Sequence, residues 1–343
     1  MSIIYNANDS NNGNIASRVK GEIISLLPIN LRNIFDKLDT NAFNALEEIR
    51  FRENKPLILK SGDDEIYLNQ DGIVNSAIKA YKVTLEDIQK TLHLISQCSI
   101  YAIEEELRNG YLTLPGGHRV GFVGEVVLDN GKAKSLKHIS SLNIRLAKEV
   151  LGCADKVMPY LYDEKNNRAY HTLIVSPPRC GKTTLLRDII RQFSNGVSKK
   201  NIGFNVGLVD ERSEIAACYL GSVQNNVGIR TDVLDGCSKA EGMLMLVRSM
   251  SPQIIATDEI GRVEDVQALE EIINSGVTVI TTVHGYNVHD IQQRPSLQAL
   301  INRKIFDRYI ILGRTLGPGT IEEILDAKTN SNLITRPIQG GGV

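Results

Sequence analysis

The sequence predicts an α/β protein in which a domain built on a mostly parallel sheet follows a smaller α+β domain. The chain has 343 residues, which is enough for two domains with separate cores. Strand and helix patterns alternate in the second half, as in a parallel sheet covered on both faces. Short strands divided by turns fill much of the first half and favour an antiparallel sheet. We expect a flexible N-terminus at 1–20, the α+β domain at 21–150, a linker at 151–168 and the α/β domain at 169–343.

The composition disfavours several classes of protein. Lys and Arg number 39 against 40 Asp and Glu, so bulk charge does not favour binding to nucleic acid. No apolar run approaches the roughly 18 residues that span a bilayer, and the first residues do not resemble a signal peptide. The five cysteines are scattered without a C-x-x-C pair, which predicts neither a zinc site nor a disulfide framework. We therefore expect a cytoplasmic protein that reaches a membrane only through partners.

The first half begins with a helical pattern over residues 20–38, which Pro28 is expected to kink or divide. Strand patterns follow at 45–51, 56–59 and 65–68. Thr84 and Asp87 have the spacing of a capping box and predict a helix to about residue 98, and a short helix is predicted at 101–107. The strands predicted last in this half are a pair within 110–127, joined by a glycine turn, and one at 140–146.

The second half alternates strands with helices. Residues 173–175 predict a buried strand, and the helix after it is expected to end near Gly196. The further strands are predicted at 204–209, 253–257 and 277–283, the helices at 242–250 and 263–275, and a hairpin at 309–312 and 320–324. Ligands of such a sheet bind beyond the carboxyl ends of its strands, and polar residues follow four of these strands.

One strand end has the pattern of a phosphate-binding loop, because a strand and a tight loop precede Gly181-Lys182-Thr183 and an amphipathic helix. Lys182 is expected to bind the β- and γ-phosphates of a nucleotide, and the Thr183 hydroxyl to bind Mg²⁺. Ser176 stands where the usual pattern has glycine, which is expected to affect the entry to the loop. The expected nucleotide-binding residues are Ser176, Pro177, Pro178, Arg179, Cys180, Gly181, Lys182, Thr183 and Thr184.

Acidic residues follow two other strands of this sheet. Asp258 is expected to hold the Mg²⁺ shell, directly or through water. Glu259 is expected to polarise the attacking water, and Glu211 is a second candidate for this base. A solvated acidic pair at a strand end is the alternative interpretation, which the phosphate-binding loop upstream disfavours.

Histidine and arginine complete the candidate site. His284 is expected to sense the γ-phosphate, although a hydrogen-bonded histidine without that role also fits the pattern. Phosphoryl transfer needs more cations than Lys182 supplies, and arginine from another domain or subunit is a recurring solution. Arg119 and Arg145 of the first domain are the candidates, although spacing alone would place them on a solvated face.

The order of these motifs resembles that of the type II/IV secretion ATPases. Residues 48–52, 116–121, 143–145 and 306–320 resemble signatures of the sporulation members of that family, and the resemblance covers nearly the whole chain beyond residue 20. The segments that correspond to Walker A, the acidic box, Walker B and the histidine box are 177–184, 209–216, 258–259 and 282–285.

The resemblance implies an ATP- and Mg²⁺-dependent motor with a RecA-like P-loop ATPase domain. It also implies that Arg119 and Arg145 of the first domain contact the nucleotide bound by the second domain. It implies a homo-oligomeric ring, expected to be a hexamer. The implied partners are membrane-embedded channel proteins of a sporulation secretion complex between mother cell and forespore, and no direct nucleic-acid partner is expected.

Two other functions fit the residues. A nucleic-acid-stimulated motor shares the RecA-like core, although balanced charge and the lack of a recognisable nucleic-acid module disfavour it. A non-hydrolysing scaffold would use nucleotide only to hold its assembly, and Ser176 in the loop is compatible with that role.

Overall fold

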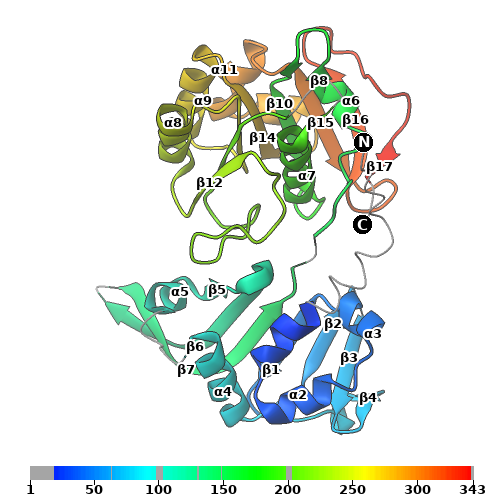
Figure 1. Ribbon diagram of the computed structural model, residues 1–343, viewed down its shortest axis with the longest axis vertical. Helices are drawn as coiled ribbons and strands as arrows, with labels where there is room; N and C mark the ends of the chain where they lie inside the picture. Colours follow the sequence, from blue (N-terminus) through cyan, green and yellow to red (C-terminus); the bar gives the residue numbers. More distant parts are fainter. Residues whose placement is uncertain are drawn as a thin grey trace, which may run out of the picture. The chain divides into compact units, whose positions relative to one another are not determined.

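The computed structural model describes residues 19–62, 64–97, 103–129, 131–147, 149–197 and 203–340. The chain divides into two compact units, Met1–Lys148 and Glu149–Val343, and each is described by itself (Figure 1). No helix within the described ranges is long and apolar enough to cross a membrane.

The first unit contains a seven-stranded sheet in which every pairing is antiparallel, as the sequence predicts. Its strands, in spatial order, are β4 (Gly72–Val74), β3 (Asp64–Asn69), β2 (Ile58–Ser61), β1 (Glu48–Arg52), β7 (Lys132–Arg145), β6 (Arg119–Asp129) and β5 (Tyr111–Thr113).

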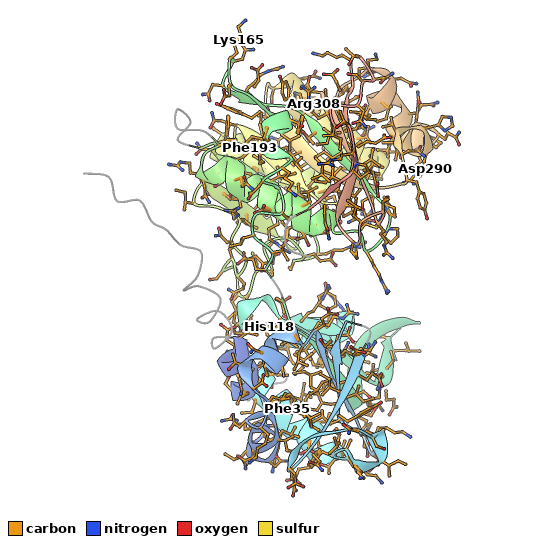
Figure 2. The ribbon with its side chains drawn as sticks, turned by 90° about the vertical axis from the view of Figure 1, so that its right-hand side faces the viewer. Phe35, His118, Lys165, Phe193, Asp290 and Arg308 are labelled. Atoms are coloured by element: carbon orange, nitrogen blue, oxygen red, sulfur yellow. The ribbon has the colours of Figure 1, made fainter. Side chains whose placement is uncertain are left out.

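One face of this sheet is buried against helices. In β1, Ile49 and Phe51 are fully buried while the residues between and beside them are only half-buried, as expected for the period of two along a strand. Phe35, labelled in Figure 2, packs edge-on against Phe43 in the same core. The helices of this unit cover residues 19–25, α2 (Ile29–Phe35), α3 (Thr40–Ala45), α4 (Leu85–Ile95) and α5 (Glu104–Asn109), with short 3₁₀ turns at Ala77–Lys79 and Pro115–Gly117.

Two local predictions in this unit are confirmed. Pro28 divides the predicted helix and forms the N-cap of α2, because proline lacks the N–H that a continuous helix would use. Thr84 and Asp87 form the capping box of α4 through reciprocal hydrogen bonds between side chain and backbone. Residues 98 and 101–102 of the two predicted helices lie outside the described residues.

The second unit is an eight-stranded mixed sheet with a parallel centre. The strands, in spatial order, are β12 (Thr231–Asp235), β11 (Val206–Asp210), β13 (Ile254–Thr257), β14 (Thr278–His284), β10 (Thr172–Ser176), β15 (Arg308–Gly313), β16 (Thr320–Asp326) and β17 (Ile338–Gln339). The pairings from β12 to β15 are parallel, and those of β16 are antiparallel. The predicted strands and the terminal hairpin are therefore present.

Helices cover both faces of this sheet (Figure 1). The side chain of Ile174 packs with the α7 side of the sheet, whereas Leu173 and Val175 pack with α8, α9 and α11. Phe193 of α7, labelled in Figure 2, lies in the first of these two layers against Phe204. The helices are α6 (Met158–Leu161), α7 (Lys182–Asn195), α8 (Lys239–Met250), α9 (Val263–Asn274), α10 (Val288–Gln292) and α11 (Pro295–Asn302).

The segment at 151–168, expected to be a linker, is folded and packed in the structure. The first residues of the second unit contain α6 and a small hairpin of β8 (Tyr162–Asp163) and β9 (Arg168–Ala169). Ala154, Val157 and Leu161 have no exposed surface and pack in the core beside α7. Their spacing of three and four residues is that of a buried helical face, so this segment is part of the second unit's core. The sequence also did not predict α3, α10, α11 or β12.

Candidate functional site

The loop that the sequence predicts to bind phosphate, called the phosphate-binding loop below, connects β10 to α7 at the carboxyl edge of the parallel strands. Arg179 and Gly181 have left-handed backbone angles, with φ of +58° and +79°. Alternation of this kind turns successive N–H groups to one side, which is the geometry that binds anions. Ser176 is fully buried and is the last residue of a regular strand, so it does not need the conformational freedom of glycine.

Asp258 lies directly beside Lys182 and Thr183. Lys182 Nζ is 3.1 Å from Asp258 Oδ1, and the Thr183 hydroxyl donates to Asp258 Oδ2 at 2.9 Å. The hydroxyl of Thr282 donates a further short hydrogen bond to the same carboxylate. Burial alone would raise the pKa of Asp258, but Lys182 and the two hydroxyl groups outweigh burial and hold that pKa below its ordinary value.

Glu259 follows with a left-handed backbone, φ +49°, which is uncommon for a residue with a side chain. Its backbone N–H donates to the hydroxyl of Thr282 at 2.9 Å, which helps to hold this conformation. One carboxylate oxygen is 3.3 Å from His284 Nε2, and the other is 3.8 Å from both Lys182 Nζ and Arg212. About a third of the Glu259 side chain remains exposed, so water can reach the carboxylate.

His284 ends β14 next to the loop. Its Nδ1 atom is 3.4 Å from the carbonyl oxygen of Ser176, while Nε2 faces Glu259. The ring therefore contacts both the start of the loop and the Glu259 carboxylate, so a movement of either group would alter its contact with the other.

Glu211 is held by a different cation. Lys239, the first residue of α8, forms a short ion pair with one carboxylate oxygen, and Arg262 lies 3.9 Å from the other oxygen. Burial would raise the pKa of Glu211, but Lys239 and the neighbouring arginines lower it below its ordinary value. Glu211 is thus ionised and paired, whereas Glu259 has looser contacts and more exposed surface.

Asp210 is held by backbone hydrogen bonds. Its buried carboxylate accepts from the backbone N–H groups of Glu214, Ile215 and Ala216 at 2.8–2.9 Å. Burial nevertheless raises the pKa of Asp210. Arg187 of α7 donates to the carbonyl groups of Ile215 and Glu214, at 2.6 and 2.7 Å. These bonds tie the loop after β11 to the helix that begins with Lys182.

The residues fit a Mg²⁺ ion that is shared with phosphates. Within the described part of the chain, no group of three His, Cys, Asp or Glu could hold a metal alone. Mg²⁺ commonly takes only one or two protein groups and completes its octahedron with phosphate oxygens and water. The Thr183 hydroxyl and Asp258, 2.9 Å apart, supply such a pair of oxygen groups. A small pocket beside them is lined by Asp210, Glu211, Arg212, Glu214, Lys239, Asp258 and Glu259.

The two candidate arginines belong to the first unit and lie in one row of its sheet. Arg145 is the cross-strand neighbour of both Arg119 and Glu48. The guanidinium of Arg119 lies over the ring of Tyr111, 3.6 Å from its centroid, and Arg145 Nε is 3.3 Å from a Glu48 oxygen. Both arginines are on the sheet face opposite the buried Ile49 and Ile144, and their role at a nucleotide stays a prediction.

The structure brings Lys182, Thr183, Asp258, Glu259 and His284 together within direct contacts. Sequence reasoning missed two further groups here, which are Thr282 and Lys239. Thr282 lies in a strand that also contains Thr278, Thr281 and His284, so its sequence context does not distinguish it. Lys239 opens a helix at an ordinary position, and nothing in its sequence context distinguishes it.

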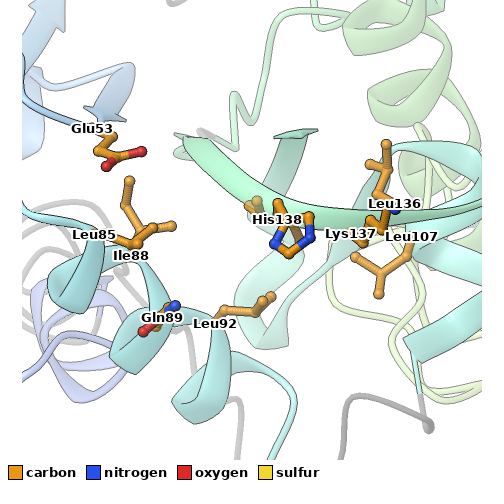
Figure 3. Close-up of a pocket in the computed structure, with 10 residues that line it drawn as sticks. Glu53, Leu85, Ile88, Gln89, Leu92, Leu107, Leu136, Lys137 and His138 are labelled. Carbon is orange, nitrogen blue, oxygen red and sulfur yellow. The ribbon is translucent and has the colours of Figure 1, made fainter. Parts of the chain in front are cut away.

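The first unit has a separate pocket between α4, α5 and β7 (Figure 3). Its lining is mainly apolar, with Leu85, Ile88 and Leu92 from α4, Leu107 from α5 and Ile139 from β7. Its polar lining consists of Glu53, Gln89, Lys137 and His138. Lys137 Nζ is 2.9 Å from a carboxylate oxygen of Glu125, and His138 Nε2 is 4.0 Å from the other.

Comparisons with known proteins show the family and the fold of the chain. The family model described as "Sporulation stage III, protein AA" matches residues 17–332. "Stage III sporulation protein AA" of Bacillus subtilis (strain 168) is 44% identical over 316 residues, which are 92% of this chain and 97% of that protein. In structure, the chain is similar to the Legionella pneumophila ATPase DotB, with a TM-score of 0.51 and 15% identity over 77% of this chain and 71% of that one. It is equally similar to the pilus retraction motor PilT with bound ADP, with a TM-score of 0.51 and 14% identity over 79% of this chain and 75% of that one.

The two structural likenesses show that the chain shares the fold of DotB and PilT, with a RecA-like α/β domain preceded by a smaller α+β domain. The family model spans most of the chain, and the Bacillus relative is matched along almost its whole length. The chain therefore belongs to the sporulation stage III protein AA family.

Proposed function

We propose that this protein is a Mg²⁺-dependent ATPase that acts as the motor of a secretion-type channel complex. One observation carries the proposal: the Lys182 ammonium, the Thr183 hydroxyl and the Asp258 carboxylate meet at the N-terminus of α7, with Glu259 beside them. A cation for phosphates, an oxygen pair for Mg²⁺ and a carboxylate open to water are the groups that nucleotide hydrolysis requires.

Each group has a distinct task in this mechanism. The N–H groups of the loop and the N-terminus of α7 bind phosphate oxygens, and Lys182 adds a full positive charge at the β- and γ-phosphates. Thr183 and Asp258 would hold Mg²⁺, which neutralises charge on the phosphates when bound. Glu259 orients and polarises the attacking water, because its carboxylate is accessible to solvent and stands next to Lys182.

Glu211 has a supporting task. Its ion pair with Lys239 makes it a poor proton acceptor and a fixed negative charge at the rim of the pocket. His284 contacts both Glu259 and the Ser176 carbonyl, which would couple the state of the γ-phosphate to β14. Arg119 and Arg145 are proposed to approach the nucleotide from the first unit and to stabilise negative charge as it develops.

Membership of the sporulation family supports a proposal for the assembly and the partners of this ATPase. We infer a homo-oligomeric ring, with six copies by resemblance to secretion ATPases, bound to membrane-embedded partners of the channel between mother cell and forespore. Movement of the first unit relative to the second during turnover would transmit force to those partners.

Phosphate release from ATP by the purified full chain tests this proposal. We expect Mg²⁺-dependent turnover that Lys182→Ala abolishes and that added DNA or RNA leaves unchanged. Nucleotide binding without any turnover would indicate a scaffold instead, and stimulation by nucleic acid at physiological salt would indicate a nucleic-acid motor.

A further inference from the structure

Arg314 lies in the segment that connects β15 to β16, 134–136 residues after the phosphate-binding loop in sequence. Its guanidinium donates to the carbonyl oxygens of Pro178 and Arg179, each at 3.2 Å. Its Nε atom is 3.3 Å from Cys180 Sγ. One side chain thus contacts three consecutive residues of the loop.

These contacts complement the geometry that the loop needs. A loop that turns its N–H groups toward phosphate turns carbonyl groups away, and those carbonyl groups need donors of their own. Arg314 supplies donors to two of them at once, because the two hydrogens of its Nη2 atom can point to different carbonyl oxygens.

The loop also contains strain that must be held. Arg179 has φ of +58°, a conformation that costs about 1 kcal/mol or more for a residue with a Cβ atom. Pro177 and Pro178 have no N–H and cannot fix the loop through backbone donation. The carbonyl of the strained Arg179 is one of the two that accept from Arg314, so the arginine stabilises the loop where its own backbone is least favourable.

The rest of the β15–β16 connection follows the loop closely. A Cβ atom added at Gly181 would lie 3.7 Å from Gly319 Cα, so a single side-chain carbon at Gly181 would reach the backbone of the connection. Cys180 is only 1% exposed and packs in the core beside α7. The connection therefore covers the side of the loop from which Arg314 donates.

We propose that Arg314 is a positioning residue that braces the phosphate-binding loop in its anion-binding conformation. The proposal rests on the ATPase function proposed above, because it assumes that this loop binds nucleotide. The affinity for nucleotide then depends on the C-terminal hairpin, whereas the chemical step, which uses other groups, does not.

Titration of the full chain with a fluorescent ADP analogue in the presence of Mg²⁺ measures the affinity for nucleotide. We expect Arg314→Ala to raise the Kd, and the KM for ATP, about tenfold, while kcat at saturating ATP stays within about twofold. The Kd of Arg314→Lys should lie between those of the wild type and Arg314→Ala, since an ammonium can donate to the two carbonyl oxygens but has no second nitrogen to contact Cys180 Sγ. Arg303→Ala is the matched control, because Arg303 is an exposed arginine of the same unit that pairs with Glu270.

A second measurement needs no nucleotide. We expect maleimide to label the Cys180 thiol several-fold faster in Arg314→Ala than in the wild type, read by peptide mass. Buried Cys153 of the same unit serves as the internal reference, and its rate should not change.

The outcomes separate this inference from the proposed function. Wild-type affinity and wild-type Cys180 labelling in Arg314→Ala would overturn the brace, as would an equal effect of Arg303→Ala. If Arg314→Ala does not fold, Arg314→Lys decides by the same two readouts. If the wild type binds no nucleotide, the proposed function fails, and the labelling rate alone then decides whether Arg314 holds the loop.

Discussion

Replacement of Lys182 by alanine should destabilise the second unit in the absence of any nucleotide. The Lys182 and Asp258 side chains are only 11% and 15% exposed, and their charged atoms are 3.1 Å apart. Alanine at position 182 would leave the Asp258 carboxylate charged and largely buried without its cation. Such a loss is costly because an uncompensated buried charge retains its desolvation penalty.

The size of the effect follows from the geometry. At 3.1 Å and an effective dielectric constant of about 20, the attraction is about 5 kcal/mol before desolvation is subtracted. The hydroxyl groups of Thr183 and Thr282 still donate to Asp258 in the variant and offset part of the loss. We expect a net decrease of about 2 kcal/mol in the free energy of unfolding, below the roughly 3–5 kcal/mol of a broken, fully buried pair.

The effect should depend on pH in a defined direction. The pKa of Asp258 is lowered in the folded protein, so the stabilisation is complete above the ordinary aspartate pKa of about 4 and is lost as the pH falls through the lower, folded-state value. The free energies of unfolding of the wild type and Lys182→Ala should therefore show their full difference at pH 7. This difference should shrink as the pH falls below about 4.

Calorimetry of the nucleotide-free full chain, with the wild type and Lys182→Ala compared at the same pH, measures this difference in stability. A loss of about 2 kcal/mol corresponds to a fall of about 4–8 °C in Tm for a unit of this size. Lys182→Ala combined with Asp258→Asn should recover about 1 kcal/mol, since the amide carries no charge to leave unpaired. A Tm equal to that of the wild type, or strictly additive effects of the two changes, would refute the reasoning.

Two further predictions concern the loop entry and the first unit. Ser176→Gly should lower the free energy of unfolding by about 0.5–1 kcal/mol and leave the nucleotide Kd within about twofold, because Ser176 has a regular strand backbone; a large gain in affinity, measured by titration, would show that serine distorts the loop. Arg119→Ala should lower kcat at least tenfold, measured by phosphate release, with a change in nucleotide Kd of no more than about threefold; equal loss of binding and turnover would argue against transition-state stabilisation by this arginine.

Features that depend on neighbouring residues in the chain could be predicted from the sequence. The loop could be located because an apolar strand, a Gly-Lys-Thr turn and an amphipathic helix are contiguous in the chain. Asp258 and His284 could be placed at one edge because parallel strands carry their carboxyl ends to the same side. The capping box of α4 was likewise visible in four consecutive residues.

Features that depend on pairing across the fold could not be predicted. Lys239 meets Glu211 across 28 residues, and Arg314 meets the loop across more than 130, and neither distance leaves a pattern in a single sequence. Gly152 and Pro159 predict a linker after residue 150, but the structure has a packed segment there. Its buried residues have helical spacing, and tertiary packing decided the outcome.

Turnover by Glu259→Gln, compared with Glu211→Gln, tests the central claim most directly. We expect Glu259→Gln to lose about 100-fold or more in the rate of phosphate release while it binds ATP as the wild type does, since an amide cannot accept the proton of the attacking water. Glu211→Gln should lose less than about tenfold, because Glu211 is already committed to Lys239. Wild-type turnover in Glu259→Gln would contradict the account.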